Sequence, residues 1–404
     1  MRLHHVTSLT FMLLTSTLAS QFPAGYKDTS IANVKSRGSR SLTVRIYYPA
    51  TSAGANKPLR QQAGGYPVIV YLHGLGGRAV FYTGLGQSLA AAGFIAVLND
   101  TARFDANLQV LDGIALFASL QAKNKSSTSF FKGAFDMTRA GVSGHSMGGG
   151  STIRTLAANP GYKAGFCFAP WDGTIFGIGN SWTKSSPAVR VPLAILHGAG
   201  DPVVNWRSIG LVFYNKATNY TGLKSFVLLN ATATHNNIVR LPVLPTSRDR
   251  AVYARGMAMI IGWFDHHLRG GVMGLEQVVG NSTRKNSLFK SISTAYRTPE
   301  LWRFGPTKIG RTSSLSIGGE PGNAAVYLSP GTKTIPLPFG VLKLDPAVIL
   351  FLAGGKLTAS KMLSFATVIP NNAKLIGGKV WLQGITNGTK SGLQLTGVVP
   401  IVIQ

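Results

Sequence analysis

Short apolar segments alternate with longer amphipathic segments over most of the first 270 residues. Each apolar segment is four to seven residues long and almost continuously apolar, which is typical of strands buried on both faces of a parallel sheet. Helices are expected between these strands. The alternation therefore predicts an α/β fold with a mostly parallel sheet. The expected strands of this kind are 67–72, 94–98, 140–143, 165–168, 193–196 and 226–229, preceded by an alternating strand at 41–48, and the expected helices are 79–92, 106–122, 147–158, 205–218 and 249–268.

The hydrophobic pattern changes near Trp302. From there to the last residue, short apolar segments are separated by Gly, Pro and Asn, and helical periodicity is limited to a turn at 359–364. This pattern predicts a small all-β, sandwich-like domain at 305–404, joined by a connector at 281–304 to an α/β domain at 21–280. Its strands are expected at 324–328, 348–352, 379–382 and 398–403.

The composition is that of a globular protein, but the charge is strongly positive. Hydrophobic residues make up 45% of the 404 residues, enough for the core of two domains. Forty Lys and Arg against thirteen Asp and Glu give a net charge of +27. The basic residues are dispersed and no zinc-finger, homeodomain or RNP pattern is present, so we expect no nucleic-acid partner. A basic surface of this kind favours adsorption to anionic membranes, acidic polymers or cell walls.

The first twenty residues are laid out like a secretory signal peptide. A basic start is followed by a moderately apolar stretch and then by small residues, with cleavage expected near Ala19 or Ser20. A short buried first helix is the alternative. We expect a secreted protein. The single cysteine, Cys167, cannot form an intrachain disulfide, and its apolar neighbours predict a buried, inert thiol.

Residues 141–151 read G-V-S-G-H-S-M-G-G-G-S and contain the motif G-x-S-x-G around Ser146. The motif follows a predicted strand and precedes a predicted helix, which is the context of a nucleophile elbow. The turn is so tight that side chains at the flanking positions 144 and 148 would clash. The alternative is a glycine-rich bend between two packed elements. We predict that Ser146 is a nucleophile.

A nucleophilic serine needs a histidine base and an acid that orients it, and these follow the elbow in the order acid, then histidine. Asp201 comes just after the predicted strand 193–196, and His235 lies in the loop after 226–229. Asp201 could instead form a simple turn, and His235 could be a surface histidine. His266 and His267 lie in a predicted helix, where we expect them to face solvent.

The segment Y-L-H-G-L-G-G at 71–77 follows a predicted strand directly. A glycine-rich loop at this place lets a backbone N–H point at a substrate oxygen. By position we predict that Leu75 and Met147 provide the two oxyanion N–H groups. A phosphate-binding loop is the alternative, but no Lys-Ser/Thr follows the glycines.

These segments together resemble the bacterial cutinase and polyester hydrolase family of the α/β-hydrolase fold, which includes poly(ethylene terephthalate) hydrolases and is related to dienelactone hydrolases. The likeness spans roughly residues 30–270. It is most specific in G-H-S-M-G-G-G and in the A-P-W that ends at Trp171. The resemblance implies the triad Ser146, Asp201 and His235, and it implies that Trp171 lines the acyl subsite. A tryptophan of the core is the alternative for Trp171.

The chain also departs from that family. The family's oxyanion loop is usually Pro-Gly-Tyr or Pro-Gly-Phe, whereas here it is His73-Gly74-Leu75, closer to general esterases and lipases. The family's common C-terminal disulfide is impossible with one cysteine, and the predicted β domain lies outside the resemblance.

From these features we expect a monomeric serine ester hydrolase that acts on polyesters or bulky hydrophobic esters and uses neither a metal nor an organic cofactor. Two alternatives remain. One is a lipase or general esterase with the same triad, and the other is a surface-binding protein whose β domain is the main functional part.

Overall fold

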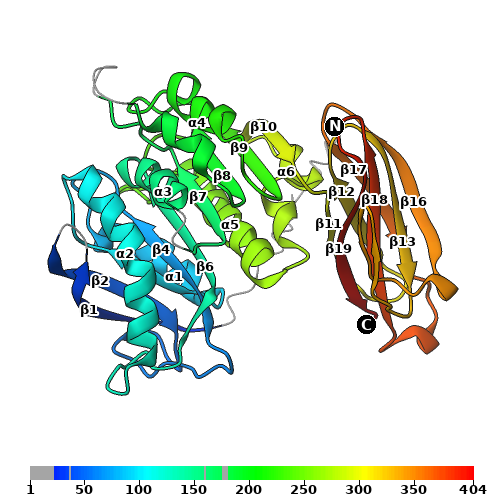
Figure 1. Ribbon diagram of the computed structural model, residues 1–404, viewed down its shortest axis with the longest axis horizontal. Coiled ribbons are helices and arrows are strands. Elements are labelled where there is room, and N and C mark those ends of the chain that lie inside the picture. The colour runs from blue at the N-terminus through cyan, green and yellow to red at the C-terminus, as the bar shows by residue number, and fades with distance from the viewer. Residues whose placement is uncertain (1–21, 36–37, 159–160, 175–180) are drawn as a thin grey trace, which may run out of the picture.

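The larger part of the computed structural model is a ten-stranded sheet in the order β10-β9-β8-β7-β6-β4-β5-β2-β1-β3 (Figure 1). The structure describes residues 22–35, 38–158, 161–174 and 181–404, so the expected signal peptide lies outside the described residues. The six strands from β9 to β5 in this order are parallel, and β2 and β10 flank them as antiparallel neighbours. The strands are β1 (Ala24–Lys35), β2 (Ser39–Pro49), β3 (Gly54–Ala55), β4 (Tyr66–Leu72), β5 (Ile95–Asn99), β6 (Phe135–His145), β7 (Ala164–Phe168), β8 (Leu193–Gly198), β9 (Leu223–Leu229) and β10 (Phe289–Tyr296).

Helices cover both faces of this sheet (Figure 1). Along β4, Ile69 and Tyr71 join the core that contains α1 and α5, whereas Val68 and Val70 join the core that contains α2, α3 and α4. Because each central strand contributes to both cores, its sequence is continuously apolar. The predicted α/β fold is therefore confirmed. The helices are α1 (Thr83–Ala91), α2 (Ala106–Lys125), α3 (Met147–Ala157), α4 (Leu211–Lys216), α5 (Ser247–Arg269) and α6 (Asn281–Arg284), with short turns η1 (Ala79–Tyr82), η2 (Trp182–Ala188), η3 (Trp206–Gly210) and η4 (Gly274–Gln277).

The C-terminal part is all-β, as predicted. A three-stranded sheet, β11-β12-β17, faces a four-stranded sheet, β16-β13-β18-β19. Leu315 and Ile317 of the first sheet share a core with Val326, Leu382 and Val399 of the second, so the region is a sandwich. Its elements are β11 (Glu300–Phe304), β12 (Thr312–Gly318), β13 (Gly322–Ser329), β14 (Ile335–Leu337), β15 (Gly340–Leu342), β16 (Leu350–Leu357), β17 (Met362–Val368), β18 (Lys379–Gly388) and β19 (Gly392–Val402), with the turns η5 (Pro346–Val348) and η6 (Ala373–Leu375).

The structure changes the interpretation of residues 281–304 and 359–364. Strand β10 pairs with β9 at the edge of the large sheet, and β11 pairs with β12 in the sandwich. The chain therefore passes from one sheet to the other between Tyr296 and Glu300, and little of the expected connector is a linker. The segment expected to form a helical turn at 359–364 instead leads into β17, which begins at Met362.

Strand β11 joins the two parts of the chain because its side chains alternate between two cores. Leu301 belongs to the sandwich core, whereas the next residue, Trp302, is fully buried in the core formed by α1 and α5. The Trp302 indole Nε1–H donates to Glu276 Oε2 at 3.0 Å, and the other oxygen of that carboxylate accepts from the Ser282 N–H at 2.7 Å. Both oxygens of the buried Glu276 carboxylate thus accept a hydrogen bond, one of them from strand β11 of the sandwich.

We predict that Trp302 contributes strongly to the stability of the whole chain. Trp302→Ala is expected to lower the free energy of unfolding by about 3–5 kcal/mol, because it empties a core site. Trp302→Phe fills most of that site but leaves Glu276 without its indole donor, so about 1–3 kcal/mol is expected. Urea unfolding followed by circular dichroism measures both losses. Phe351→Ala is the control, since Phe351 is 64% exposed. A loss at Trp302 no larger than that at Phe351 would contradict the prediction.

Candidate active site

Ser146 lies at the point where β6 ends and α3 begins. Its backbone φ is 56°, in the left-handed region that residues other than glycine rarely adopt. A Cβ atom at position 144 would lie 2.3 Å from the Gly148 carbonyl oxygen, and one at 148 would lie 2.0 Å from the Leu72 carbonyl oxygen. Glycine is therefore required at both flanking positions. A Cβ there would meet backbone atoms, which cannot move aside as a flexible side chain could.

Two backbone hydrogen bonds hold this strained turn. The Ser146 N–H donates to the Phe168 carbonyl at 3.0 Å, and the Trp171 N–H donates to the Ser146 carbonyl at 2.9 Å. Both partners belong to β7 or the loop after it. The elbow is thereby fixed to the neighbouring strand as well as to its own helix.

Asp201 and His235 come together after β8 and β9. The Nδ1 of His235 lies 2.8 Å from Asp201 Oδ2, while Asp201 Oδ1 accepts from the N–H groups of Val203 and Val204 at 2.8 and 2.9 Å. Burial by itself would raise the pKa of Asp201, but the hydrogen bond and positive charge of His235 outweigh burial and hold that pKa below its ordinary value. The carboxylate therefore stays ionised and fixes the orientation of the His235 ring.

His145, the residue just before Ser146, connects His235 to the loop after β4. Its Nε2 lies 2.7 Å from the His235 carbonyl oxygen, which can only accept, so Nε2 carries the proton. Its Nδ1 then accepts from the Tyr82 hydroxyl at 3.1 Å, and the Tyr82 oxygen accepts from the Gly74 N–H at 3.0 Å. Burial, and secondarily the charge of His235, lowers the pKa of His145 well below its ordinary value, which keeps the ring neutral. Sequence reasoning did not assign His145 or Tyr82 to the site.

The structure brings all six predicted site residues to one place. Ser146 and His235 line a cavity of about 380 Å³, as do Leu75, Met147 and Trp171, while Asp201 lies buried behind His235. Met147 is the first residue of α3, where the N–H groups of a helix have no partner within it. The side chain of Leu75 is 63% exposed at the cavity rim.

The walls of this cavity are mainly apolar. The Trp171 indole packs edge-on against Trp182 with ring centroids 5.3 Å apart, and its Nε1–H donates to the Thr174 carbonyl at 2.7 Å. Trp171 is half-buried and lines the cavity. Phe81, from η1, contributes a second aromatic ring that sequence reasoning missed.

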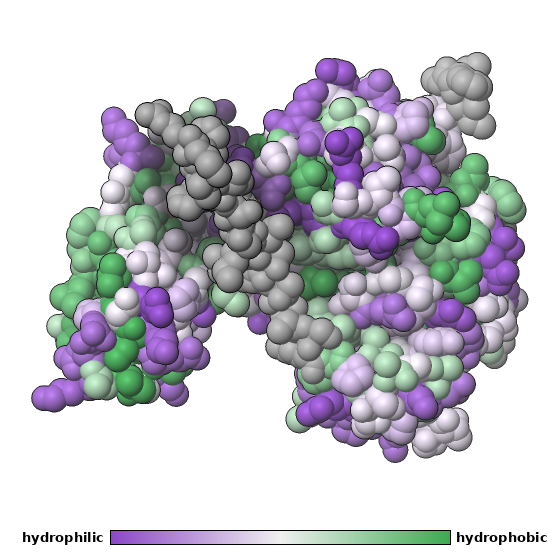
Figure 2. Space-filling view, turned by 180° about the vertical axis from the view of Figure 1, so that it is seen from behind, coloured by the Kyte–Doolittle hydropathy of each residue, from purple (hydrophilic) through white to green (hydrophobic). Residues whose placement is uncertain are grey.

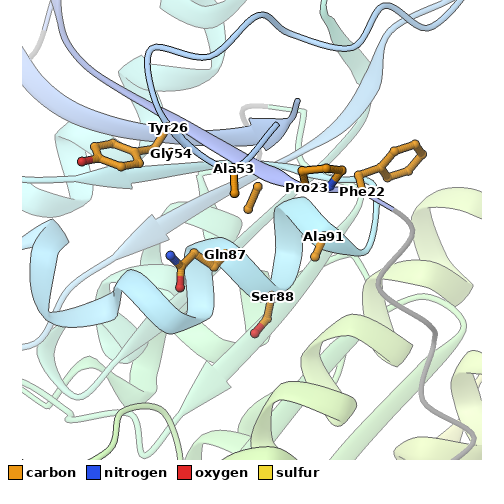
Figure 3. A pocket seen from close by; sticks show the side chains of 9 residues that line it. Phe22, Pro23, Tyr26, Ala53, Gly54, Gln87, Ser88 and Ala91 are labelled. Carbon is orange, nitrogen blue, oxygen red and sulfur yellow. The ribbon is translucent and has the colours of Figure 1, made fainter. Parts of the chain in front are cut away.

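A larger hollow of about 560 Å³ lies between β1 and α1 and shares no residue with the cavity at Ser146. Figure 3 shows that small and apolar side chains, including Pro23, Ala53 and Ala91, line most of it. Tyr26 is its one titratable residue. The Ser88 hydroxyl in this hollow donates to the Gly84 carbonyl at 2.7 Å, and the lining includes no histidine or carboxylate that could act on it.

The remaining chemically reactive residues are placed as follows. His197 is buried at the end of β8 with Nδ1 3.8 Å from Asp201 Oδ2, and burial lowers its pKa to about 4. Burial raises the pKa of the Cys167 thiol, which agrees with the predicted inert role. His266 and His267 do not face solvent as expected. His266 Nε2 lies 3.2 Å from Glu300 Oε2, and the His267 ring lies 4.2 Å from that of Trp263.

Within the described ranges, no group of three His, Cys, Asp or Glu residues has a metal-binding arrangement. In the same part of the chain, no helix combines the length and apolar character needed to span a bilayer.

Comparisons with known proteins identify the family of this chain. The sequence model of the PETase family, described as PET hydrolase-like, matches residues 16–240. A bis(hydroxyethyl) terephthalate hydrolase of Streptomyces coelicolor is 28% identical over 52% of this chain and 60% of its own length. Cutinase est1 of Thermobifida alba is 29% identical over 48% of this chain and 58% of its own. The chain thus spans about 60% of the length of these relatives, and residues 305–404 lie outside the family match.

The close approach at the elbow predicts that Gly148→Ala cannot be accommodated. Its Cβ would meet the Leu72 backbone oxygen at 2.0 Å, so we expect a loss of more than about 4 kcal/mol in the free energy of unfolding or no soluble protein. Gly397→Ala is the matched control, because nothing lies within 4 Å of its Cβ. Thermal unfolding of the two variants gives the comparison, and equal midpoints would refute the prediction.

The Tyr82 hydroxyl is predicted to support the site. Tyr82→Phe removes the group that joins Gly74 to His145, so we expect a loss of about 1–3 kcal/mol in stability and a several-fold lower kcat. Tyr48→Phe is the control, because its buried hydroxyl donates to the Lys57 carbonyl at 2.8 Å and does not line the cavity, so this variant should keep its kcat. Ester turnover and urea unfolding are measured on both. Similar results for the two variants would show that the connection is unimportant.

Proposed function

Because the chain belongs to the PET hydrolase-like family, we propose that it is a serine carboxylic-ester hydrolase acting through Ser146, His235 and Asp201. The observation that carries this proposal is the 2.8 Å contact between Asp201 and His235 beside a cavity that Ser146 also lines. A nucleophile, a base and an acid that orients the base are the three groups that acyl transfer requires.

The first half of the reaction forms an acyl-enzyme. His235 Nε2 takes the proton of the Ser146 hydroxyl as Oγ attacks the ester carbonyl carbon. Asp201, ionised and bonded to Nδ1, stabilises the imidazolium that results. The N–H groups of Leu75 and Met147 stabilise the oxyanion, with the N-terminal end of α3 contributing its positive dipole. Collapse of the intermediate expels the alcohol, which receives the proton from His235.

The second half repeats these steps with water. His235 removes a proton from the water molecule that attacks the acyl carbon, and it then returns the proton to Ser146 Oγ as the acid leaves. Every proton is carried by a side chain already named, so the sequence of steps calls for no cofactor.

We propose that the substrates are polyesters or bulky hydrophobic esters. The named activities of the relatives, cutinase and bis(hydroxyethyl) terephthalate hydrolase, support this substrate class. So do the aromatic rings of Trp171 and Phe81 in the cavity wall. Leu75, at the position where the family usually has an aromatic residue, favours the alternative of a lipase or general esterase.

Adsorption to a substrate surface is part of the proposal. Figure 2 shows apolar residues along the outer edge of the sandwich. Leu350 and Phe351 of the edge strand β16 are 59% and 64% exposed. The sandwich from 305 to 404 also carries nine Lys and Arg against two Asp and Glu. An apolar edge on a basic domain suits a hydrophobic polymer that carries negative charge.

We further propose a secreted, monomeric protein with an α/β catalytic domain and this β domain as separate units.

The proposal predicts that Ser146→Ala lowers kcat for p-nitrophenyl butyrate by at least about 10⁴-fold, because the nucleophile is lost. Asp201→Asn is expected to lower kcat by about 10⁴-fold, since the His235 ring loses its ionised partner.

Ser143→Ala is the matched control, because this serine lies just before the motif. The Ser143 hydroxyl, in β6, donates to the Phe166 carbonyl of β7 at 2.6 Å and does not line the cavity, so this variant is expected to keep its activity. Turnover is measured on protein whose circular dichroism matches the unmodified chain. Activity that survives in Ser146→Ala would refute the assignment.

A further inference from the structure

Arg240 is a charged residue in the wall of the cavity at Ser146. It follows His235 by five positions and lines the same cavity as Phe81 and Asn236. Its Nε–H donates to Asn236 Oδ1 at 3.1 Å, and its guanidinium carbon lies 5.7 Å from the centre of the Phe81 ring. The contact through Nε leaves the two terminal nitrogens of the guanidinium for another partner.

The charge of Arg240 has no acidic partner in the part of the chain that the structure describes. Among the described residues no Asp or Glu lies within ion-pair distance of Arg240, and the residues lining the cavity include neither acid. Asp201 is the nearest acid in the mechanism, but its side chain is fully buried and both oxygens are bonded elsewhere. The cavity therefore presents one positive side chain among apolar walls.

This cation also acts on the interior of the site. It is one of the charges, after burial and His235, that lower the pKa of His145, and it opposes the effect of burial on the pKa of Tyr82. A cation so close to the triad also works against the positive charge that His235 must acquire during the reaction. A negative group on the substrate would offset that repulsion.

We propose that Arg240 binds a carboxylate carried by the substrate, so that the site also takes half-esters of dicarboxylic acids, the species left at chain ends when a polyester is cut. A guanidinium with two free N–H groups matches the two oxygens of a carboxylate. A cavity of about 380 Å³ holds one ring or a short chain with its ester and acid groups. This inference rests on the proposed function and specifies the substrate class of the same site.

The test compares two esters that differ in charge. Bis(2-hydroxyethyl) terephthalate is neutral, whereas mono(2-hydroxyethyl) terephthalate carries one carboxylate, and the products of both are separated by liquid chromatography. We expect the unmodified chain to hydrolyse both. Arg240→Gln is expected to lower the ratio of kcat/KM for the monoester over the diester by about tenfold, mainly through KM, and Arg240→Lys to retain part of the ratio. Any disturbance of His235 acts on both esters and cancels in the ratio.

Arg250→Gln is the matched control, because it removes one charge from an exposed position of α5 that does not line the cavity. Its ratio should stay within about twofold of the unmodified chain. Addition of 0.5 M NaCl should raise KM for the monoester more than for the diester. An unchanged ratio in Arg240→Gln, an equal fall in Arg250→Gln, or turnover of the diester without any turnover of the monoester by the unmodified chain would overturn the inference.

A binding measurement separates this inference from the proposed function. Calorimetry of the monoester with Ser146→Ala needs no turnover, and adding Arg240→Gln to that variant should weaken binding at least fivefold. If the unmodified chain hydrolyses neither ester while this difference persists, the proposed function fails and the anion site stands. If both esters are hydrolysed and the difference is absent, the anion site alone fails.

Discussion

The strained backbone at Ser146 is the constraint on which the rest of the site depends. A φ of 56° on a residue with a side chain costs about 1–3 kcal/mol and persists only where the surroundings enforce it. Here Gly148 lies against the last carbonyl of β4, and backbone hydrogen bonds tie Ser146 to Phe168 and Trp171. Strands β4, β6 and β7 therefore meet at the elbow, and the position of the Trp171 wall depends on that of Ser146.

His145 extends this constraint to the other side of the cavity. Because burial keeps its ring neutral, one nitrogen donates to the His235 backbone while the other accepts from Tyr82, which in turn accepts from Gly74. The loop that carries Leu75 and the loop that carries His235 are thus fixed to the same residue. Asp201 then sets the rotation of the His235 ring. Such prior positioning lowers the reorganisation that a developing charge would otherwise require.

Features that depend on a local sequence pattern could be predicted from the sequence. Buried parallel strands are continuously apolar, and a glycine-flanked serine between strand and helix is a local motif, so the α/β fold, the elbow and the order of Asp201 and His235 could be anticipated. The link from Tyr82 to His145 joins positions 63 residues apart and has no local signal. Strand β10 was missed because an edge strand is half-buried and lacks a continuous apolar run. His266 was misplaced because its partner, Glu300, arrives from the sandwich.

The cavity at Ser146 and the surface of the protein carry charge of the same sign. Inside the site the negative charge of Asp201 is buried and used by His235, so the open cavity is positive through Arg240. Outside, a net charge of +27 attracts anionic surfaces. Each cleavage of a polyester leaves one new carboxylate, so the surface becomes more negative as hydrolysis proceeds. Under the proposed function, a cavity of the same sign as the protein surface would accept the new chain ends, whereas an acidic cavity would repel the products that accumulate around it.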